Sequence, residues 1–382
     1  IAAIIAQSVN QTSSTANLLN DESRNVGGQE FGEFRDVEAS SSGSTITLTS
    51  KVAGVDFTVT ASESTAGSGA LGTPTTATAA TGPGDIGNTE NYSGGSLPAS
   101  DDTLIFDRGS FDLVQNLDGL NDRTNIRFLP GFTGNAGLMP TTPAGYPEYR
   151  TPRYLDQGVD GTGSVTLEVN SPTGWRLLDL TTTTGTTQTV TIYQTAVDDV
   201  QGAAPCQVVG GDNLVFHMRG GNAGLGMDVS QSAVDLQQIF CSGPSTLGVG
   251  LGVSFDNVAD SIRLDGGTID LHVSVSGANN VIHINNGTLN TVRSDVAIDQ
   301  IDIRGGLLRH TGANITSLNL FAGTADLTAT SSAASITDVN CHRGVVLIDP
   351  FGYAATFNAV GCSLSDFQHV TRPNREWTHA TI

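Results

Sequence analysis

Lysine is nearly absent from this chain: Lys51 is the only lysine among 17 basic residues. Against 38 acidic residues, these leave a formal net charge of -21. A chain this acidic is repelled by phosphate backbones and by anionic lipid, which argues against nucleic-acid and membrane-surface partners. The sequence also has no run of about 18 apolar residues, the length that spans a bilayer. We therefore expect no nucleic-acid partner and no membrane partner.

Cysteine is scarce as well, and its spacing excludes the common metal motifs. The four cysteines are Cys206, Cys241, Cys341 and Cys362. None forms a CxxC pair or accompanies a paired histidine motif, so we expect no zinc site, no other metal and no cofactor. The last two lie 21 residues apart, so they could stack in a repeat, but buried free thiols are favoured over a disulfide.

Charged residues make up only 14% of the chain, whereas 38% of its residues are hydrophobic and 46 are glycine. Disorder would require more charge and fewer β-branched residues. This composition is typical of an all-β, turn-rich protein found outside cells or in a virion. Because the first residue is Ile1 rather than methionine, we expect either processing or a longer parent chain.

Four short segments in the last third repeat one pattern, an apolar-polar-apolar triplet that is closed by a glycine turn. They are Ile262–Gly267, Ile282–Gly287, Ile301–Gly306 and Leu318–Gly323, and their closing glycines are spaced 20, 19 and 17 residues apart. Alternation with a period of two indicates strands rather than helices. A repeat of this length indicates stacked units that bury their apolar faces together. The pattern predicts a mainly β protein with a right-handed parallel β-helix.

The rest of the chain predicts the domain organisation around this β-helix. A helix over 1–9 and strands at 44–49 and 57–60, joined by 51–54, predict a small α+β domain. Strands at 165–169, 189–193 and 214–218 continue the β-helix, and 247–253 alternates with glycine, which permits close approach of another backbone. The predicted parts are 1–62, the α+β anchoring domain; 63–84, a Ser/Thr/Gly linker; 85–160, a β-rich leading region with an irregular Pro/Tyr loop; 161–362, the β-helix; and 363–382, a C-terminal tail or cap.

Two segments carry a resemblance to known proteins. Residues 1–62, with Ala53–Thr60 reading AGVDFTVT, resemble a small domain of tailed-phage virion proteins, including tail sheath and related components. Residues 91–106 are similar to the NWSGGxxPxxxDTVIF segment that opens β-helical proteins of phage structural modules and some bacterial surface proteins; Tyr92 stands in place of the tryptophan. The resemblance implies a virion or surface location and supplies no catalytic residues.

Aligned repeats would place polar side chains in outward columns, with neighbours ~4.8 Å apart. One column would contain Arg263, His283, Asp302 and Asn319, and another Asp270, Asn290 and Asp326. As an enzyme site, the first column could bind a uronate, with carboxylates sharing acid–base work in a polysaccharide lyase or hydrolase. Alternatively, these are ordinary solvated positions, and the side-chain charges are chosen so that like charges do not lie next to each other on adjacent coils. The second interpretation is favoured, because a site needs a cleft and only the 130–152 loop offers a second wall.

One group of aromatic and cationic residues suggests a contact surface. It contains Tyr146, Tyr149, Arg150, Arg153 and Tyr154. Tyrosine and arginine dominate such surfaces, so the group could bind another protein or a glycan, or else pack back on its own solenoid. His272 and His283 lack carboxylates at metal-ligand spacing, so surface or subunit contacts are favoured over a metal pair or a pH-sensitive interface.

These observations predict a non-enzymatic structural protein at the surface of a tailed-phage particle. The first choice is a trimeric capsid decoration or cement protein that binds the major capsid protein or other virion proteins, because side-by-side solenoids can bury apolar strips around a threefold axis. A tail fibre or spike that binds host glycan is the second choice. A polysaccharide-degrading enzyme is the third, and a bacterial surface adhesin is the fourth.

Overall fold

The computed structural model describes residues 37–50, 75, 82–118, 120, 125–139, 152–157, 163–181, 186–199, 203–228, 231, 233–256, 261–277, 280–293, 295–329, 334–348, 354–359 and 362–366. The chain divides into two compact units. The first contains residues 1–97, 112–119 and 137–154, and the second contains residues 98–111, 120–136 and 155–382. Among the described residues, no helix is long and apolar enough to cross a bilayer.

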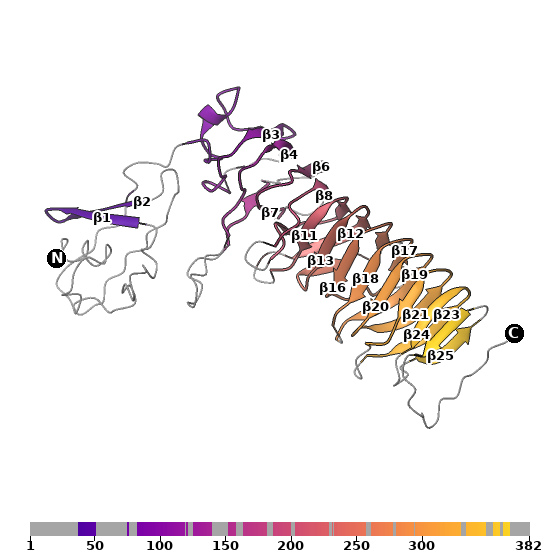
Figure 1. Ribbon diagram of the computed structural model, residues 1–382. Coiled ribbons are helices and arrows are strands. Elements are labelled where there is room, and N and C mark those ends of the chain that lie inside the picture. Colours follow the sequence, from indigo (N-terminus) through magenta and orange to yellow (C-terminus); the bar gives the residue numbers. More distant parts are fainter. Residues whose placement is uncertain are drawn as a thin grey trace, which may run out of the picture. The chain divides into compact units, whose positions relative to one another are not determined.

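The first unit contains an antiparallel hairpin, in which β1 (Val37–Ser42) pairs with β2 (Thr45–Ser50) (Figure 1). Ser42 lies opposite Thr45, so Gly43 and Ser44 form a two-residue turn. Gly43 has φ +61°, the left-handed conformation that hairpin turns of this length require. The strand predicted at 44–49 is therefore confirmed.

The partner of that strand was not predicted, because β1 has only a short alternation and few apolar residues. The helix predicted over 1–9, the connection at 51–54 and the strand at 57–60 lie outside the described residues. The described part of this small domain is thus a two-stranded antiparallel sheet.

A second part of this unit is a group of polar contacts around Asp85, which includes Tyr92 from the segment that begins at residue 91. The Asp85 carboxylate accepts hydrogen bonds from the Gly87 amide at 2.8 Å and from Asn116 Nδ2 at 2.6 Å. Tyr92 Oη donates to the carbonyl oxygen of Ile86 at 2.7 Å. Burial, together with the nearby Asp85 charge, raises the pKa of Tyr92 to about 12. These contacts hold residues 82–92 and 112–118 together.

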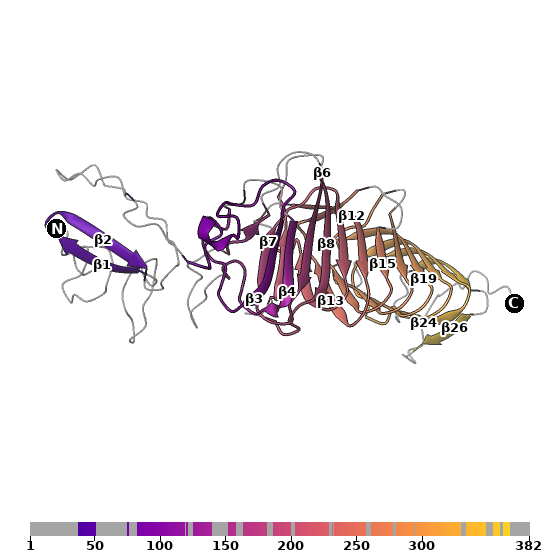
Figure 2. The ribbon, with the colours of Figure 1, turned by 90° about the horizontal axis from the view of Figure 1, so that it is seen from above.

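The second unit is a β-solenoid built from two parallel sheets, which run side by side from coil to coil (Figures 1 and 2). Among the described residues, one sheet has 13 strands and the other has 11. The 13-stranded sheet contains β3 (Thr103–Gly109), β4 (Asn125–Phe132), β6 (Gly163–Asn170), β8 (Thr186–Gln194), β10 (Leu214–Met218), β12 (Val234–Cys241), β14 (Val253–Phe255), β15 (Ile262–Leu264), β17 (Val281–Ile284), β19 (Ala297–Ile303), β21 (Asn314–Leu320), β23 (Ile336–Cys341) and β25 (Ala354–Ala359). The 11-stranded sheet contains β5 (Leu155–Asp156), β7 (Arg176–Asp179), β9 (Cys206–Val209), β11 (Gly221–Leu225), β13 (Ser245–Val249), β16 (Thr268–Leu271), β18 (Thr288–Thr291), β20 (Leu307–His310), β22 (Thr324–Asp326), β24 (Gly344–Ile348) and β26 (Cys362–Asp366).

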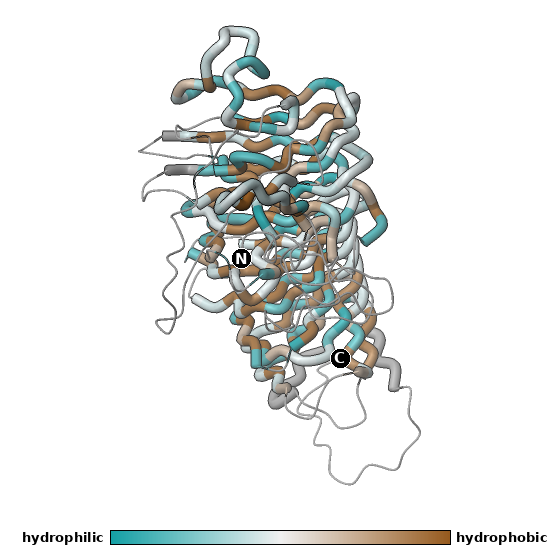
Figure 3. Tube along the Cα trace, turned by 90° about the vertical axis from the view of Figure 1, so that its left-hand side faces the viewer, coloured by the Kyte–Doolittle hydropathy of each residue, from teal (hydrophilic) through white to brown (hydrophobic). Residues whose placement is uncertain are grey.

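The four repeated triplets fall in β15, β17, β19 and β21, which confirms the β-helix. Ile262 lies opposite Ile282, Ile282 opposite Ile301, and Ile301 opposite Leu318. All four side chains are fully buried, so each coil adds one aliphatic layer to the interior. Apolar and polar positions alternate along the stacked coils (Figure 3).

The solenoid begins earlier than the predicted boundary at residue 161. Strands β3 and β4 pair with each other, and β4 pairs with β6 in the same parallel sheet. Phe106 and Phe128 stack at 4.9 Å between ring centroids and pack against Phe132. The predicted leading region at 85–160 therefore contains the first solenoid strands.

The turns between the sheets depend on glycine in a left-handed conformation. Gly287 has φ +90° and Gly306 has φ +73° at equivalent places in successive coils. A Cβ atom on Gly306 would lie 2.5 Å from the Gly287 carbonyl oxygen. Any other residue would therefore clash with the preceding coil as well as strain the backbone.

The alternating segment at 247–253 is not one strand, which corrects the prediction. Strand β13 ends at Val249, the chain turns, and β14 begins at Val253 and pairs with β12. A Cβ on Gly250 would lie 2.4 Å from the carbonyl oxygen of Gly226. The predicted close approach is therefore present, and the backbone that approaches belongs to the preceding coil.

Among the described residues of the solenoid, a charged side chain lies buried in the interior. Arg176 is 2% exposed and lies over the rings of Phe128 and Phe132 at 4.9 and 5.1 Å. Its guanidinium donates to the carbonyl oxygens of Gly134 and Trp175, each at 2.7 Å. Hydrogen bonds and aromatic faces thus replace the water that this cation loses on folding.

Candidate functional site

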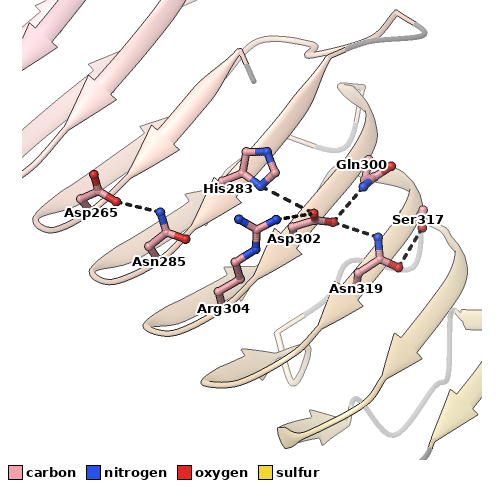
Figure 4. A network of polar contacts seen from close by, with 8 residues as sticks. All are labelled: Asp265, His283, Asn285, Gln300, Asp302, Arg304, Ser317 and Asn319. Carbon is pink, nitrogen blue, oxygen red and sulfur yellow. Dashed lines mark hydrogen bonds and ion pairs between the residues drawn. The ribbon is translucent and has the colours of Figure 1, made fainter. Parts of the chain in front are cut away.

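The outer face of the 13-stranded sheet carries the polar column that the sequence predicts. Arg263 lies opposite His283. His283 lies opposite Asp302, and Asp302 lies opposite Asn319 (Figure 4). The predicted alignment is therefore confirmed residue by residue. The same register continues to Asn340 in β23.

Asp302 is the centre of this column. Its Oδ1 atom accepts hydrogen bonds from Gln300 Nε2 at 2.8 Å and from Asn319 Nδ2 at 2.9 Å. Its Oδ2 atom lies 3.6 Å from His283 Nδ1 and 3.7 Å from Arg304 Nη2. Asp302 is only 7% exposed, so the carboxylate is enclosed by its neighbours although it points outward. This corrects the expectation of an ordinary solvated position.

Asn319 extends the network to the next coil. Its Oδ1 atom accepts from Asn340 Nδ2 at 3.0 Å and from Ser317 Oγ at 3.3 Å. Amide groups therefore donate from each coil to the preceding one, and the series ends on the Asp302 carboxylate. Such a series stabilises the stacking of coils, because the Asn319 and Asn340 side chains each donate a hydrogen bond to the preceding coil.

Arg263 does not converge with His283 and Asp302, although it belongs to the same column. Its Nε atom binds Asp265 Oδ2 at 2.9 Å. Asp265 Oδ1 in turn accepts a hydrogen bond from Asn285 Nδ2 at 2.7 Å (Figure 4). The guanidinium thus turns along its own coil toward the following glycine turn. An arginine, a histidine and an aspartate that share one column are therefore not gathered around a common point.

The second predicted column is aligned on the 11-stranded sheet. Asp270 lies opposite Asn290, whose Nδ2 atom donates to Asp270 Oδ1 at 2.6 Å. Arg309 stands between Asn290 and Asp326, a member that the sequence analysis missed. The arginine separates two groups of acceptors, as expected if the columns avoid neighbouring like charges.

The predicted Tyr/Arg contact group is described only in part. Tyr146, Tyr149 and Arg150 lie outside the described residues. Arg153 pairs its backbone with Leu138, and Tyr154 is 9% exposed. The burial of Tyr154 contradicts its prediction as a contact residue, because little of the ring is left for a partner.

The structure instead brings together aromatic and cationic side chains from successive coils that sequence reasoning missed. Arg219 lies over the Tyr193 ring at 5.0 Å, and His217 stacks on Phe240 at 4.8 Å between ring centroids. Burial and the Arg219 charge lower the pKa of His217 below its usual value. These residues are more than 20 positions apart in the chain, so only knowledge of the coil length could have grouped them.

The cysteines and histidines form no metal site in the part of the chain that the structure describes: no group of three or more His, Cys, Asp or Glu side chains could hold a metal ion there. Cys206 and Cys241 are buried free thiols. Burial raises the pKa of Cys206 to about 12. Cys341 is disulfide-bonded, which corrects the expectation of a free thiol.

The site geometry is thus an outer face of aligned polar columns, with one enclosed carboxylate and one exposed aromatic–cationic pair. Comparisons of the chain with protein-family models, with curated proteins and with solved structures gave no match.

Proposed function

We propose that this chain is a non-enzymatic structural protein at the surface of a tailed-phage particle, where it acts as a trimeric decoration or cement protein. It would lie outside the cell on the virion and bind the major capsid protein or other virion proteins. The observation that supports this proposal best is the parallel solenoid from β3 to β26, whose coils are tied to one another on the outside as well as in the core. Such a body keeps its shape under load, because each coil is fixed to both neighbours.

The Asp302 network supports a structural role over a catalytic one. A general acid or base needs an accessible carboxyl group beside the substrate. Asp302 has two donors on Oδ1, lies near His283 and Arg304 through Oδ2, and is almost fully enclosed. Its interactions are those of a residue that holds coils together.

Counting the copies of this chain in purified particles by quantitative mass spectrometry tests the proposal. A decoration protein is expected in a fixed ratio to the major capsid protein. It should also leave the capsid on mild heating or at low salt, and the particles should then become more sensitive to heat. A few copies that fractionate with tails would overturn the proposal in favour of a glycan-binding fibre. Absence from particles would overturn the virion location altogether.

A further inference from the structure

The outer face of the 11-stranded sheet carries a column without charges over five successive coils. Its members are the first outward residues of β13, β16, β18, β20 and β22, which lie opposite one another on neighbouring strands (Figure 1). We name it the threonine column; it contains Thr246, Thr268, Thr288, Leu307 and Thr324. On a chain with a net charge of -21, such a strip lets a second copy approach without local repulsion.

A charged column lies beside the threonine column, and its charge changes sign over three coils. Asp270, Asn290 and Arg309 lie opposite one another in β16, β18 and β20. Asn290 Nδ2 donates to Asp270 Oδ1 at 2.6 Å. Asp326 on the next coil accepts hydrogen bonds from the amide and the hydroxyl of Thr328, and Arg309 is exposed to solvent. The three residues therefore run from a negative to a positive end across the coil of β18.

An exposed apolar side chain lies on the middle coil of the same face. Val292 follows the last residue of β18 and is 45% exposed. Its amide donates to the carbonyl oxygen of Leu271 at 3.2 Å, so Val292 continues the parallel register of the sheet. The equivalent residues on the adjacent coils, His272 and Thr311, are partly exposed. Three successive coils thus present apolar, uncharged and charged positions side by side, the combination that protein interfaces use.

We infer that two copies of this chain bind each other through this face, with their solenoids antiparallel. The twofold axis would run parallel to β18, so that the coil of β18 meets its equivalent in the second copy. The coil of β16 would then meet the coil of β20 of the second copy. Asp270 of each copy would face Arg309 of the other, and the two Val292 side chains would pack together at the axis. Each copy thus supplies both sides of the same ion pair.

The order of the charges favours the antiparallel arrangement over the parallel one. In a parallel pair about a twofold axis, equal coils would meet, which would place Asp270 opposite Asp270 and Arg309 opposite Arg309. The contact does not depend on the trimer of the proposed function, since a twofold contact pairs two monomers or two trimers alike. It goes beyond that function, because it supplies a surface through which copies of this chain would link to one another in pairs.

Sedimentation velocity of the full chain over a range of concentrations tests the inference. The mass of wild type is expected to double reversibly, from monomer to dimer or from trimer to hexamer, and salt should weaken this step. Asp270→Arg and Arg309→Asp should each weaken it by about tenfold or more, because one substitution creates repulsion at both symmetric positions. The double variant should regain association, because it exchanges the charges across the axis. Arg108→Asp, at a side chain of the other sheet that is 85% exposed, is the matched control and should associate like wild type.

A cysteine substitution reports the orientation of the two copies. Under mild oxidation, Val292→Cys should form a disulfide with its equivalent in the second copy, because both side chains lie at the axis. Val197→Cys, at a 70% exposed position in the connection from β8 to β9, is the control and should stay unlinked. Far-UV circular dichroism verifies that each variant keeps its β structure.

Three results would overturn the inference. One is a mass that never doubles, and another is a doubling that neither charge reversal weakens. The third is a disulfide that forms only when Val292→Cys is mixed with Thr288→Cys, because those positions meet in a parallel pair. None of these results touches the proposed function, which the number of copies in purified particles tests separately.

Discussion

Neutral His310 inside the solenoid should make the protein less stable as the pH falls. His310 faces the interior from β20 and is fully buried. Its Nδ1 atom lies 2.8 Å from Thr291 Oγ1 of the preceding coil. Burial lowers the pKa of His310 from 6.5 to about 4, because the imidazolium would lose its hydration in the interior of the solenoid. The unfolded chain, in contrast, takes up the proton near pH 6.5.

The sign and size of the effect follow from linkage. Between pH 6.5 and 4, the unfolded state binds more protons than the folded state, so stability falls as the pH falls through this window. The difference of about 2.5 pKa units corresponds to about 3 kcal/mol in total. About 2 kcal/mol of this should be lost between pH 7.5 and 5, where most carboxylates are still ionised.

Urea unfolding of wild type and His310→Gln at several pH values measures this contribution. The glutamine cannot titrate, and its intrinsic effect on stability is a constant offset, so the slope against pH isolates His310. We expect the free energy of unfolding of wild type to fall by about 2 kcal/mol more than that of the variant between pH 7.5 and 5. His272→Gln, at a partly exposed histidine, is the matched control. Equal slopes for wild type and His310→Gln would refute the reasoning, as would an equal effect in the control.

Other perturbations test the polar network, the buried cation, the turns and the thiols. Asp302→Asn should destabilise the protein by about 1–2 kcal/mol in urea unfolding, because two hydrogen bonds lose their charged acceptor; an unchanged midpoint would show that the network adds nothing. Arg176→Met should cost about 3 kcal/mol or more, since buried carbonyl oxygens lose their donor, and a stabilised variant would contradict this. Gly306→Ala should lower the melting temperature much more than Gly43→Ala, whose left-handed turn opens on free space; equal losses would exclude the coil-to-coil clash. Cys206 should react with a thiol reagent only after denaturation, because the thiol is buried and protonated; rapid native labelling would contradict its burial.

The coil architecture could be predicted because its main determinants are local in sequence. Inward positions such as Ile282 and Ile301 need apolar side chains, and the turns need glycine with positive φ. The spacing of those glycines then fixes which residues lie opposite each other, so the column through His283 and Asp302 followed from counting. Neither step needs knowledge of distant contacts.

The positions of individual side chains could not be predicted in the same way. They depend on contacts between side chains, and a pattern of polarity along the sequence does not contain those contacts. Arg176 points inward because its guanidinium contacts two phenylalanine rings and donates hydrogen bonds to carbonyl oxygens there. Its charge alone predicts a position on the surface. Arg263 lies in the predicted column but binds Asp265, two residues along its own coil. Column membership fixes the position of a backbone, whereas the direction of a long side chain is set by the nearest partner of opposite charge.

A stacked solenoid with a net charge of -21 must separate its carboxylates, because equivalent side chains on adjacent coils lie ~4.8 Å apart. In three columns an asparagine follows an aspartate one coil later and donates to it: Asn285 to Asp265, Asn290 to Asp270, and Asn319 to Asp302. An amide supplies a donor without adding a second negative charge, so the acidity is distributed without repulsion between coils.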